Sequence, residues 1–150
     1  TFPEVRTLDI KSNSFKNCVN LNKITIERSE EVHLGKFCFN KASKLSSIDI
    51  NTEQLIIDEN CFYQCESLRS LILDKVKNAV FNPGSFKECS NILNISIKNA
   101  HSLYFGEKCF IDNKNISSIE IQSNELVLNN EFINSCPHLT KIKLSSVQNI

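Results

Sequence analysis

A repeating unit of 23 or 24 residues governs this chain and limits its fold more than any local motif does. Each unit opens on a large apolar residue, followed by a short side chain at position +3 and apolar side chains at +6, +9 and +11. The units start at Phe15, Phe39, Phe62, Phe86, Phe110 and Ile133. Self-similarity at such a period is typical of solenoids, in which each unit forms one coil stacked on the last.

Two short strands are predicted in every coil, because apolar residues alternate twice per unit and alternation places them on one face. The first pairs are Ile24/Ile26, Ile48/Ile50, Leu71/Leu73, Ile95/Ile97, Ile119/Ile121 and Ile142/Leu144. The second pairs are Val32/Leu34, Leu55/Ile57, Ala79/Phe81, Leu103/Phe105 and Leu126/Leu128. The segment that closes each unit suits one helical or 3₁₀ turn. We therefore expect one right-handed, strand-rich solenoid domain over residues 1–150, with about six coils.

Stacking would place equivalent side chains about 4.8 Å apart in columns. One column is predicted to hold the Phe residues that open the units. In the last unit Ile133 takes this position and Phe132 precedes it, so local repacking is expected there. Because Gly and Pro number only 3 each, Asn is expected to make the breaks, through its tolerance of left-handed backbone. These breaks fall at Asn13, Asn60, Asn82, Asn99 and Asn129.

The two ends of the chain fall within units. Leu8 and Ile10 match a second strand without its first, and the stretch 144–150 matches the start of another, with Ile150 at the position of Val32. Neither end carries the polar cap that stacked arrays need. We expect a segment of a longer array, or an end covered by a partner.

Charge and hydropathy narrow the class of protein. Lys plus Arg and Asp plus Glu each number 17, which argues against nucleic acid and against an electrostatic membrane footprint. No apolar run approaches the roughly 18 residues of a spanning helix. No signal peptide is visible where Thr1 opens into Phe2 and Pro3.

With this register, the sequence resembles the BspA-like leucine-rich repeat family. Its unit runs as an aromatic, a Cys or small residue, a Leu and an Ile at successive intervals of three, a further Ile after one residue, and then a second apolar pair. The family's usual Pro after the first strand is missing, Asn113 stands where Cys is usual, and Ala79 is a weak strand residue. The resemblance implies a leucine-rich repeat solenoid of surface proteins in bacteria and protists, with adhesion to host or matrix proteins as the implied work.

No constellation for catalysis or cofactor binding is found. The seven Cys form two series, at the residue before the repeat start (Cys38, Cys61, Cys109) and three residues after it (Cys18, Cys65, Cys89, Cys136). We interpret the second series as small buried hydrophobes. The alternatives are disulfides between adjacent coils, as for Cys65 with Cys89 or Cys38 with Cys61, and a zinc site at Cys61 and Cys65. His33, His101 and His138 do not converge, and Glu30 with Glu31 is interpreted as a solvated turn. We expect no enzyme and no cofactor.

Two outward rows are candidate protein-binding surfaces. The second-strand row presents an apolar or amphipathic strip, and such strips often mark interfaces. Its members are His33, Ile56, Val80, Tyr104 and Val127. The first-strand face is polar with mixed charge, and is the secondary candidate. Its members are Lys23, Thr25, Asp49, Ile72, Ser96, Glu120 and Lys143. Asn94 and Asn115 begin Asn-x-Ser triplets for glycosylation, which also arise by chance in an Asn-rich chain.

These observations predict a non-catalytic scaffold that binds a protein ligand or self-associates. A cell-surface or secreted adhesin or surface antigen is the first hypothesis. The alternative is an intracellular scaffold for protein assembly, which reduced Cys series would suit. The sequence names neither the ligand nor the parent protein.

Overall fold

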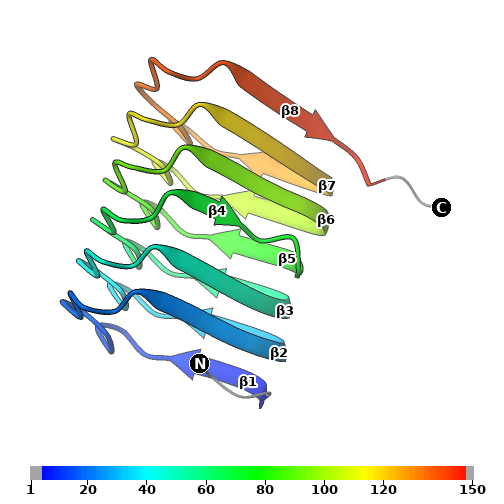
Figure 1. Ribbon diagram of the computed structural model, residues 1–150. Helices are drawn as coiled ribbons and strands as arrows, with labels where there is room; N and C mark the ends of the chain where they lie inside the picture. Colours follow the sequence, from blue (N-terminus) through cyan, green and yellow to red (C-terminus); the bar gives the residue numbers. More distant parts are fainter. Residues whose placement is uncertain (1–4, 148–150) are drawn as a thin grey trace.

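The computed structural model describes residues 5–147 and shows a right-handed parallel solenoid. In Figure 1 the chain crosses the front from left to right, returns behind and rises by one coil at each circuit. The strands are β1 (Val5–Ile10), β2 (Lys23–Leu34), β3 (Ser47–Ile57), β4 (Ser70–Ile72), β5 (Val76–Phe81), β6 (Asn94–Phe105), β7 (Ser118–Leu128) and β8 (Lys141–Ser145). They follow the order β1-β2-β3-β5-β6-β7-β8, with β4 paired to β6. The predicted solenoid with its 23–24-residue coils is confirmed.

Four coils join the two predicted strands into one bent strand. β2, β3, β6 and β7 each run along the front, turn a corner and continue behind (Figure 1). We call the part before the corner the front sheet and the part after it the back sheet. In the coil that starts at Phe62 the two parts are separate strands, β4 in front and β5 behind. β1 belongs to the back sheet alone, because Leu8 pairs with Val32 and Ile10 with Leu34, as the sequence predicted.

The difference between 23- and 24-residue coils lies at this corner. Along β2 and β3 the pairing runs from Ile26↔Ile50 to Ser29↔Thr52, which is a shift of one residue. The same one-residue shift occurs in the pairing of β6 with β7. The buried corner positions are Ser29, Thr52, Val76, Ala100 and Ser123. Where the corner residue is Ser or Thr, its hydroxyl donates to a nearby backbone carbonyl, which satisfies a polar group that is expensive to bury alone.

A column of parallel Phe rings fills the interior, as predicted. Neighbouring centroids from Phe15 to Phe110 lie 5.0–5.2 Å apart, with rings within 8° of parallel. Phe81 and Phe105 form a second stack at 4.5 Å, tilted against the first. The Phe132 ring packs edge-on against the Phe110 ring. Ile133 follows Phe110 in the column, and the backbones of these two residues form a β-bridge. This confirms the expected repacking in the last unit, where the larger ring precedes the usual position.

The edge opposite the corner contains successive hydrogen-bonded turns, where the sequence predicted one helical or 3₁₀ turn. Within residues 5–147 no helix is formed, and amides bond to carbonyls three residues back, as in Cys38 to Gly35 and Ala42 to Phe39. Two residues four apart adopt positive φ in each coil, for example Phe37 and Lys41. A left-handed residue at these two places interrupts any helix.

Asn supplies only part of the left-handed backbone. Asn13, Asn60 and Asn99 have positive φ as expected, whereas Asn82 and Asn129 do not. The side-chain amide of Asn82 donates to Asp58 and that of Asn129 to the Phe105 carbonyl. At the remaining left-handed positions the residues are of many types, and in most coils their amides donate to carbonyls of the next coil, which supports the conformation.

The last coils leave some inward-facing side chains uncovered. Ile142 is 59% exposed and Leu144 is 48% exposed, although their counterparts Ile119 and Ile121 are buried. Within residues 5–147 no further coil stacks on β8. The predicted position of Ile150 lies outside the described residues. No helix in the described part of the chain is of the length and apolar character needed to cross a membrane.

Candidate protein-binding surface

An apolar column crosses the outer face of the back sheet. Ile56, Val80, Tyr104 and Val127 lie on β3, β5, β6 and β7, and each pairs in register with the next. Ile56 is half-buried, while the other three are 38–49% exposed. A parallel sheet repeats every 4.8 Å or so, and the pairing therefore aligns four apolar side chains over about 15 Å.

A polar column runs beside the apolar one, two residues earlier on each strand. It contains Gln54, Asn78, Ser102 and Glu125. Ser102 Oγ donates to Asn78 Oδ1 at 3.1 Å, and the Asn78 amide donates to the carbonyl of Glu53. The two columns line a shallow groove of about 310 Å³. One wall of this groove offers apolar contact and the other offers amide and hydroxyl groups, which is the mixture that protein interfaces use.

His33 occupies the predicted row but is not part of the apolar column. Its Nε2 lies 3.0 Å from an Asp58 oxygen, and its Nδ1 lies 3.4 Å from Asp9. Sequence reasoning placed His33 beside Ile56 correctly. Of the two carboxylates, Asp9 pairs in register with His33 and extends the row to β1, whereas Asp58 lies outside the row. The row is therefore apolar from Ile56 onwards and polar at its β1 and β2 end.

The secondary candidate face is the front sheet, and it is tied across coils by charged groups. Lys23, Thr25, Asp49, Ile72, Ser96, Glu120 and Lys143 all lie on its strands and are exposed or half-buried. Glu120 accepts from Lys143 at 3.2 Å and lies 3.7 Å from Lys98, which lowers the pKa of its carboxyl. Asp49 pairs with Lys75 at 3.1 Å. These charged side chains form ion pairs with one another, so they leave few unpaired polar groups for a ligand.

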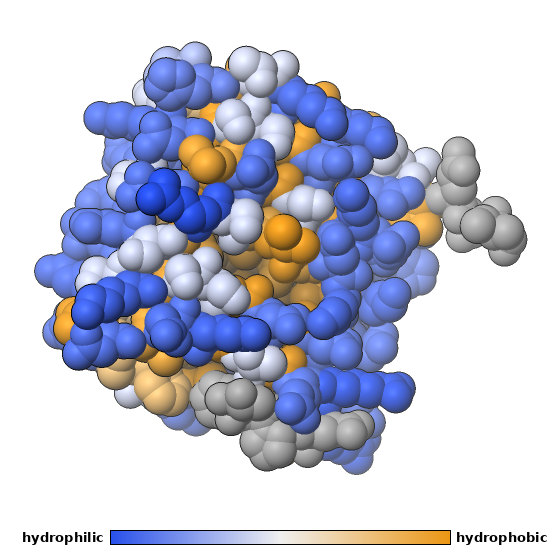
Figure 2. Space-filling model, viewed as in Figure 1, coloured by the Kyte–Doolittle hydropathy of each residue, from blue (hydrophilic) through white to orange (hydrophobic). Residues whose placement is uncertain are grey.

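The front sheet is interrupted between β3 and β4. Within residues 5–147, no ladder joins residues 47–50 to Ser70–Ile72. On this side of β3 the pairing with β5 begins only at Thr52, and β4 pairs with β6. The opening has a volume of about 310 Å³ and is lined by Ile48, Asp49, Ile50, Ile72, Asp74 and Lys75. Figure 2 shows apolar atoms in this hollow near the middle of a largely polar face. Ile72, at 52% exposure, is the front-sheet apolar residue beside it.

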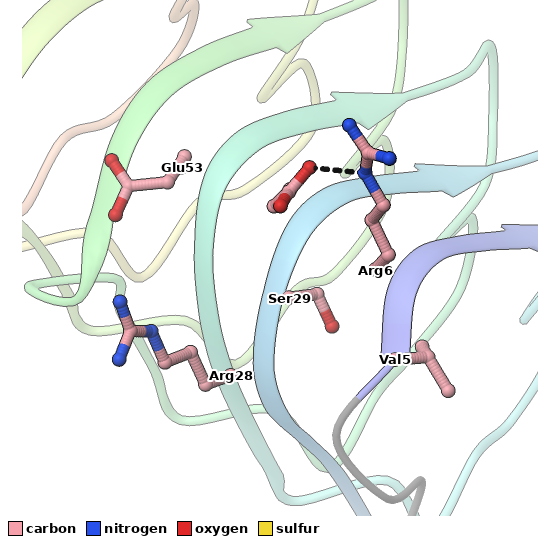
Figure 3. A pocket seen from close by; sticks show the side chains of 6 residues that line it. Val5, Arg6, Arg28, Ser29 and Glu53 are labelled. Carbon is pink, nitrogen blue, oxygen red and sulfur yellow. Dashed lines mark hydrogen bonds and ion pairs between the residues drawn. The ribbon is translucent and has the colours of Figure 1, made fainter.

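A larger hollow of about 430 Å³ lies at the corner near β1. It is lined by Val5, Arg6, Arg28, Ser29, Glu30 and Glu53 (Figure 3). Arg6 Nε donates to Glu30 at 2.7 Å, and both side chains are mostly exposed. Two cations and two carboxylates in an open hollow do not concentrate one sign of charge, and an exposed ion pair contributes little. The hollow therefore lacks the convergent polar groups that define a ligand site.

The Cys series form two columns along the turn edge, and all seven thiols are free. The predicted burial of the second series holds for Cys65 and Cys89, whereas Cys136 is half-buried and Cys18 is exposed, because no coil covers it on the β1 side within residues 5–147. The pre-Phe column holds Ser14, Cys38, Cys61, Ser85 and Cys109. The post-Phe column holds Cys18, Ala42, Cys65, Cys89, Asn113 and Cys136. Burial raises the pKa of Cys109 to about 12, and also raises that of Cys89. Such thiols remain protonated and inert, as expected of small buried hydrophobes.

Asn113 replaces Cys in the post-Phe column and keeps its hydrogen bond. Cys89 Sγ donates to the Phe62 carbonyl at 2.9 Å, and Asn113 Nδ2 donates to the Phe86 carbonyl at 2.8 Å. The amide also brings an oxygen, Oδ1, which is buried and has no partner in the described part of the chain. This column thus requires a short side chain, as predicted: Cys65, Cys89, Asn113 and Cys136 also donate to a carbonyl, whereas Ala42 only fills the space.

The remaining motifs stay apart in space. His33 lies on the back sheet, His138 is an exposed turn residue, and His101 contacts Asn124. In the described residues no three His, Cys, Asp or Glu side chains are grouped so that they could hold a metal ion. The two Asn-x-Ser triplets differ: Asn94 is exposed, whereas the Asn115 amide donates to the Ser90 carbonyl.

The coil geometry, the parallel strands and the Phe column define a leucine-rich repeat solenoid. The family model that describes the BspA-type leucine-rich repeat region matches residues 8–140 with six copies, and the chain belongs to this family. No curated protein matches the chain.

Two solved structures share the fold. One is a leucine-rich repeat protein of T. pallidum, with a TM-score of 0.65 and 15% identity over 93% of this chain. The other is a leucine-rich cell surface protein of Faecalibacterium prausnitzii, with a TM-score of 0.55 and 17% identity over 93% of this chain. The chain spans 66% of the first protein and 39% of the second.

Proposed function

We propose that the chain is a non-catalytic, protein-binding part of a cell-surface protein and acts as an adhesin or surface antigen. The observation that carries the proposal is the column of Ile56, Val80, Tyr104 and Val127, which exposes aligned apolar side chains on an unbroken sheet. Exposed apolar patches with a polar margin mark interaction sites. The name of the F. prausnitzii protein, a cell surface protein, supports the location.

The partner is a protein with an apolar, partly polar surface rather than a small molecule. The groove beside the column is open and shallow, whereas sites for small molecules enclose most of the ligand. Tyr104 is the central anchor, since it is the aromatic member and aromatic residues contribute heavily to interfaces. Host-surface or matrix proteins are the partners that an adhesin would meet, and a second copy of the chain is the partner in self-association.

The test is a double variant, Ile56→Glu with Tyr104→Glu, which places two charges in the column. We expect binding to immobilised host-cell surface and matrix proteins, or self-association in sedimentation velocity, to fall at least tenfold. Burying two unpaired carboxylates costs far more than the free energy that corresponds to a tenfold change, about 1.4 kcal/mol. Circular dichroism should be unchanged, because both side chains point outwards.

The matched control is Thr25→Glu with Ser96→Glu on the front sheet, which adds the same charge and should leave binding intact. Equal loss of binding in both variants would move the site away from the back sheet. Unchanged binding in the Ile56/Tyr104 variant would reject the column as the binding site.

An intracellular scaffold for protein assembly is the second candidate. The observation that favours it is the presence of seven free thiols, five of them buried, because free Cys persists in reducing compartments. Titration of the free thiols, after denaturation of protein taken from its source, separates the two hypotheses. Seven titratable thiols in protein taken from its source would favour the reducing compartment.

A further inference from the structure

We infer that Cys38 and Cys61 form a site of reversible oxidation, at which a disulfide links two adjacent coils, whereas Cys65 and Cys89 do not. Both pairs are stacked neighbours in their columns, so proximity alone does not separate them. The hydrogen bonds of the four sulfur atoms do.

The backbone stacks Cys38 and Cys61 directly on one another. Phe39 N donates to the Cys61 carbonyl at 2.9 Å, which fixes residues 38 and 61 one above the other. The adjoining rings of Phe39 and Phe62 stack at 5.2 Å. A coil spacing of this size lies within the Cα separation of about 4.4–6.8 Å that disulfides span. Two coils further on, the same backbone bond joins Phe86 N to the Cys109 carbonyl, and there the side-chain atoms Ser85 Oγ and Cys109 Sγ lie 3.3 Å apart.

The two sulfurs also differ in reactivity. The hydrogen bond from Cys61 lowers the pKa of the Cys38 thiol, and backbone amides of Phe15 and Ser14 add to this effect. Burial, together with the neighbouring Cys38, raises the pKa of Cys61. A thiol of lowered pKa next to a protonated one is the arrangement of an attacking and a resolving cysteine.

The Cys65 and Cys89 thiols already donate hydrogen bonds to backbone carbonyls. Cys65 Sγ donates to the Phe39 carbonyl at 3.3 Å and Cys89 Sγ donates to the Phe62 carbonyl at 2.9 Å. A disulfide there would remove both protons and both hydrogen bonds in a fully buried place, which is unfavourable. Within the described residues, neither Cys38 nor Cys61 donates its thiol proton to a carbonyl, so a disulfide there removes no such bond.

The oxidant is a low-molecular-weight disulfide such as oxidised glutathione. The Cys38 thiolate attacks one sulfur of the disulfide, which forms a mixed disulfide and releases one thiolate. Cys61 then loses its proton and attacks the Cys38 sulfur, which forms the Cys38–Cys61 bond and releases the second thiolate. Two protein thiols are oxidised and one disulfide is reduced to two thiols. Because both sulfurs are fully buried, exchange takes place while the coils close or during local opening.

The experiment refolds the full chain from denaturant in buffers of oxidised and reduced glutathione at several ratios. The folded monomer is isolated, its free thiols are alkylated, and its peptides are mapped by mass spectrometry. We expect a Cys38–Cys61 cross-link with the loss of two hydrogens, and alkylated Cys65, Cys89 and Cys109. The linked form should unfold at a higher denaturant midpoint than the reduced form, because the link closes a loop of the unfolded chain.

The chain itself offers conservative control variants. Cys61→Ser reproduces Ser14 and Ser85 of the same column, so it should fold and leave Cys38 without an internal link. Cys65→Ala reproduces Ala42 and should leave the Cys38–Cys61 link unchanged. Recovery of Cys38 and Cys61 as thiols at every ratio would overturn the inference. So would a Cys65–Cys89 link that forms as readily, or a Cys38–Cys61 link confined to misfolded material.

Discussion

The back sheet and the front sheet are built from the same coils, yet only the back sheet is continuous. β1, β2, β3, β5, β6 and β7 pair without interruption behind the corner. In front, the ladder stops between β3 and β4, and the ion pair of Lys75 with Asp49 spans the opening. The coil before the opening, which starts at Phe39, is one residue shorter than the coil after it, which starts at Phe62.

Repeat length explains this difference better than side-chain type does. Where a longer coil is followed by a shorter one, the strand register shifts by one residue at the corner and both sheets stay paired. This is the case for β2 with β3 and for β6 with β7. The opposite step, from the shorter coil to the longer one, leaves β4 as a short strand, and the extra length projects around Asp74 and Lys75. The back sheet keeps its register in both cases, and it therefore offers the fixed geometry that a binding surface requires.

The largest expected effect comes from a change that both sheets share. Phe62→Ala removes a fully buried ring that stacks on Phe39 and Phe86, and should lower the free energy of unfolding by about 3–5 kcal/mol. Chemical denaturation followed by circular dichroism measures this loss. Because the ring lies between the sheets, amide exchange should accelerate in both. Acceleration confined to the front sheet would show that the two sheets are not one cooperative unit. Phe15→Ala, at a half-buried ring, should cost less.

A change in coil length should remove the contrast between the sheets. One Lys inserted between Asn51 and Thr52 makes the short coil equal in length to the coil that follows it, so that residues 47–50 and β4 should pair. Amide exchange of peptides that cover 47–51 and 69–73 should slow by about tenfold, which corresponds to about 1.4 kcal/mol of local stability.

The same insertion between Asn99 and Ala100 provides the control. It lengthens a coil that is already of the longer kind, and should disturb the pairing of β6 and β7 instead. An unchanged exchange pattern after the first insertion would mean that coil length does not cause the opening.

The smallest effect concerns the charges of the front sheet. The hydrogen bond from Lys143, with the charge of Lys98, lowers the pKa of Glu120. A carboxyl whose pKa is lowered on folding stabilises the fold above its unfolded pKa, near 4.5, and this stabilisation is lost as the pH falls through the folded value. Lys143→Ala should raise the pKa of Glu120 in an NMR titration, and Lys141→Ala should raise it less. Equal shifts in the two variants would contradict the assigned cause.

The sequence predicted the coils, the Phe column and the two rows of outward side chains, because each depends on spacing alone. The spacing places Asp9 in register with His33, but it did not predict the contact of His33 with Asp58, which follows the in-register residue Ile56 by two positions. It also missed the opening beside Ile72. A one-residue difference in unit length is visible in the sequence, but its consequence depends on which neighbouring coil is longer.

The turn edge shows a similar limit. The sequence favoured one helical or 3₁₀ turn with Asn at the breaks, whereas residues such as Phe37, Lys41 and Gln64 adopt positive φ. Their amides donate to carbonyls of the following coil, as in Lys41 to Tyr63 and Gln64 to Lys87. In these coils the conformation is supported by a neighbour one full coil further along the chain, which local preference does not reveal. Glu131 and Ser135 adopt it as well, where no following coil lies within residues 5–147.

These left-handed turns link each coil, apart from the last one within residues 5–147, to the coil after it. A residue such as Phe37 or Lys41 is strained by itself, at a cost of roughly 1 kcal/mol or more, and an isolated coil would lose that shape. Two adjoining coils are thus the smallest unit able to hold it. Duplication of a unit would supply both the strained residues and the carbonyls that secure them, so such a chain can grow or shrink by whole units during evolution without new contacts being devised.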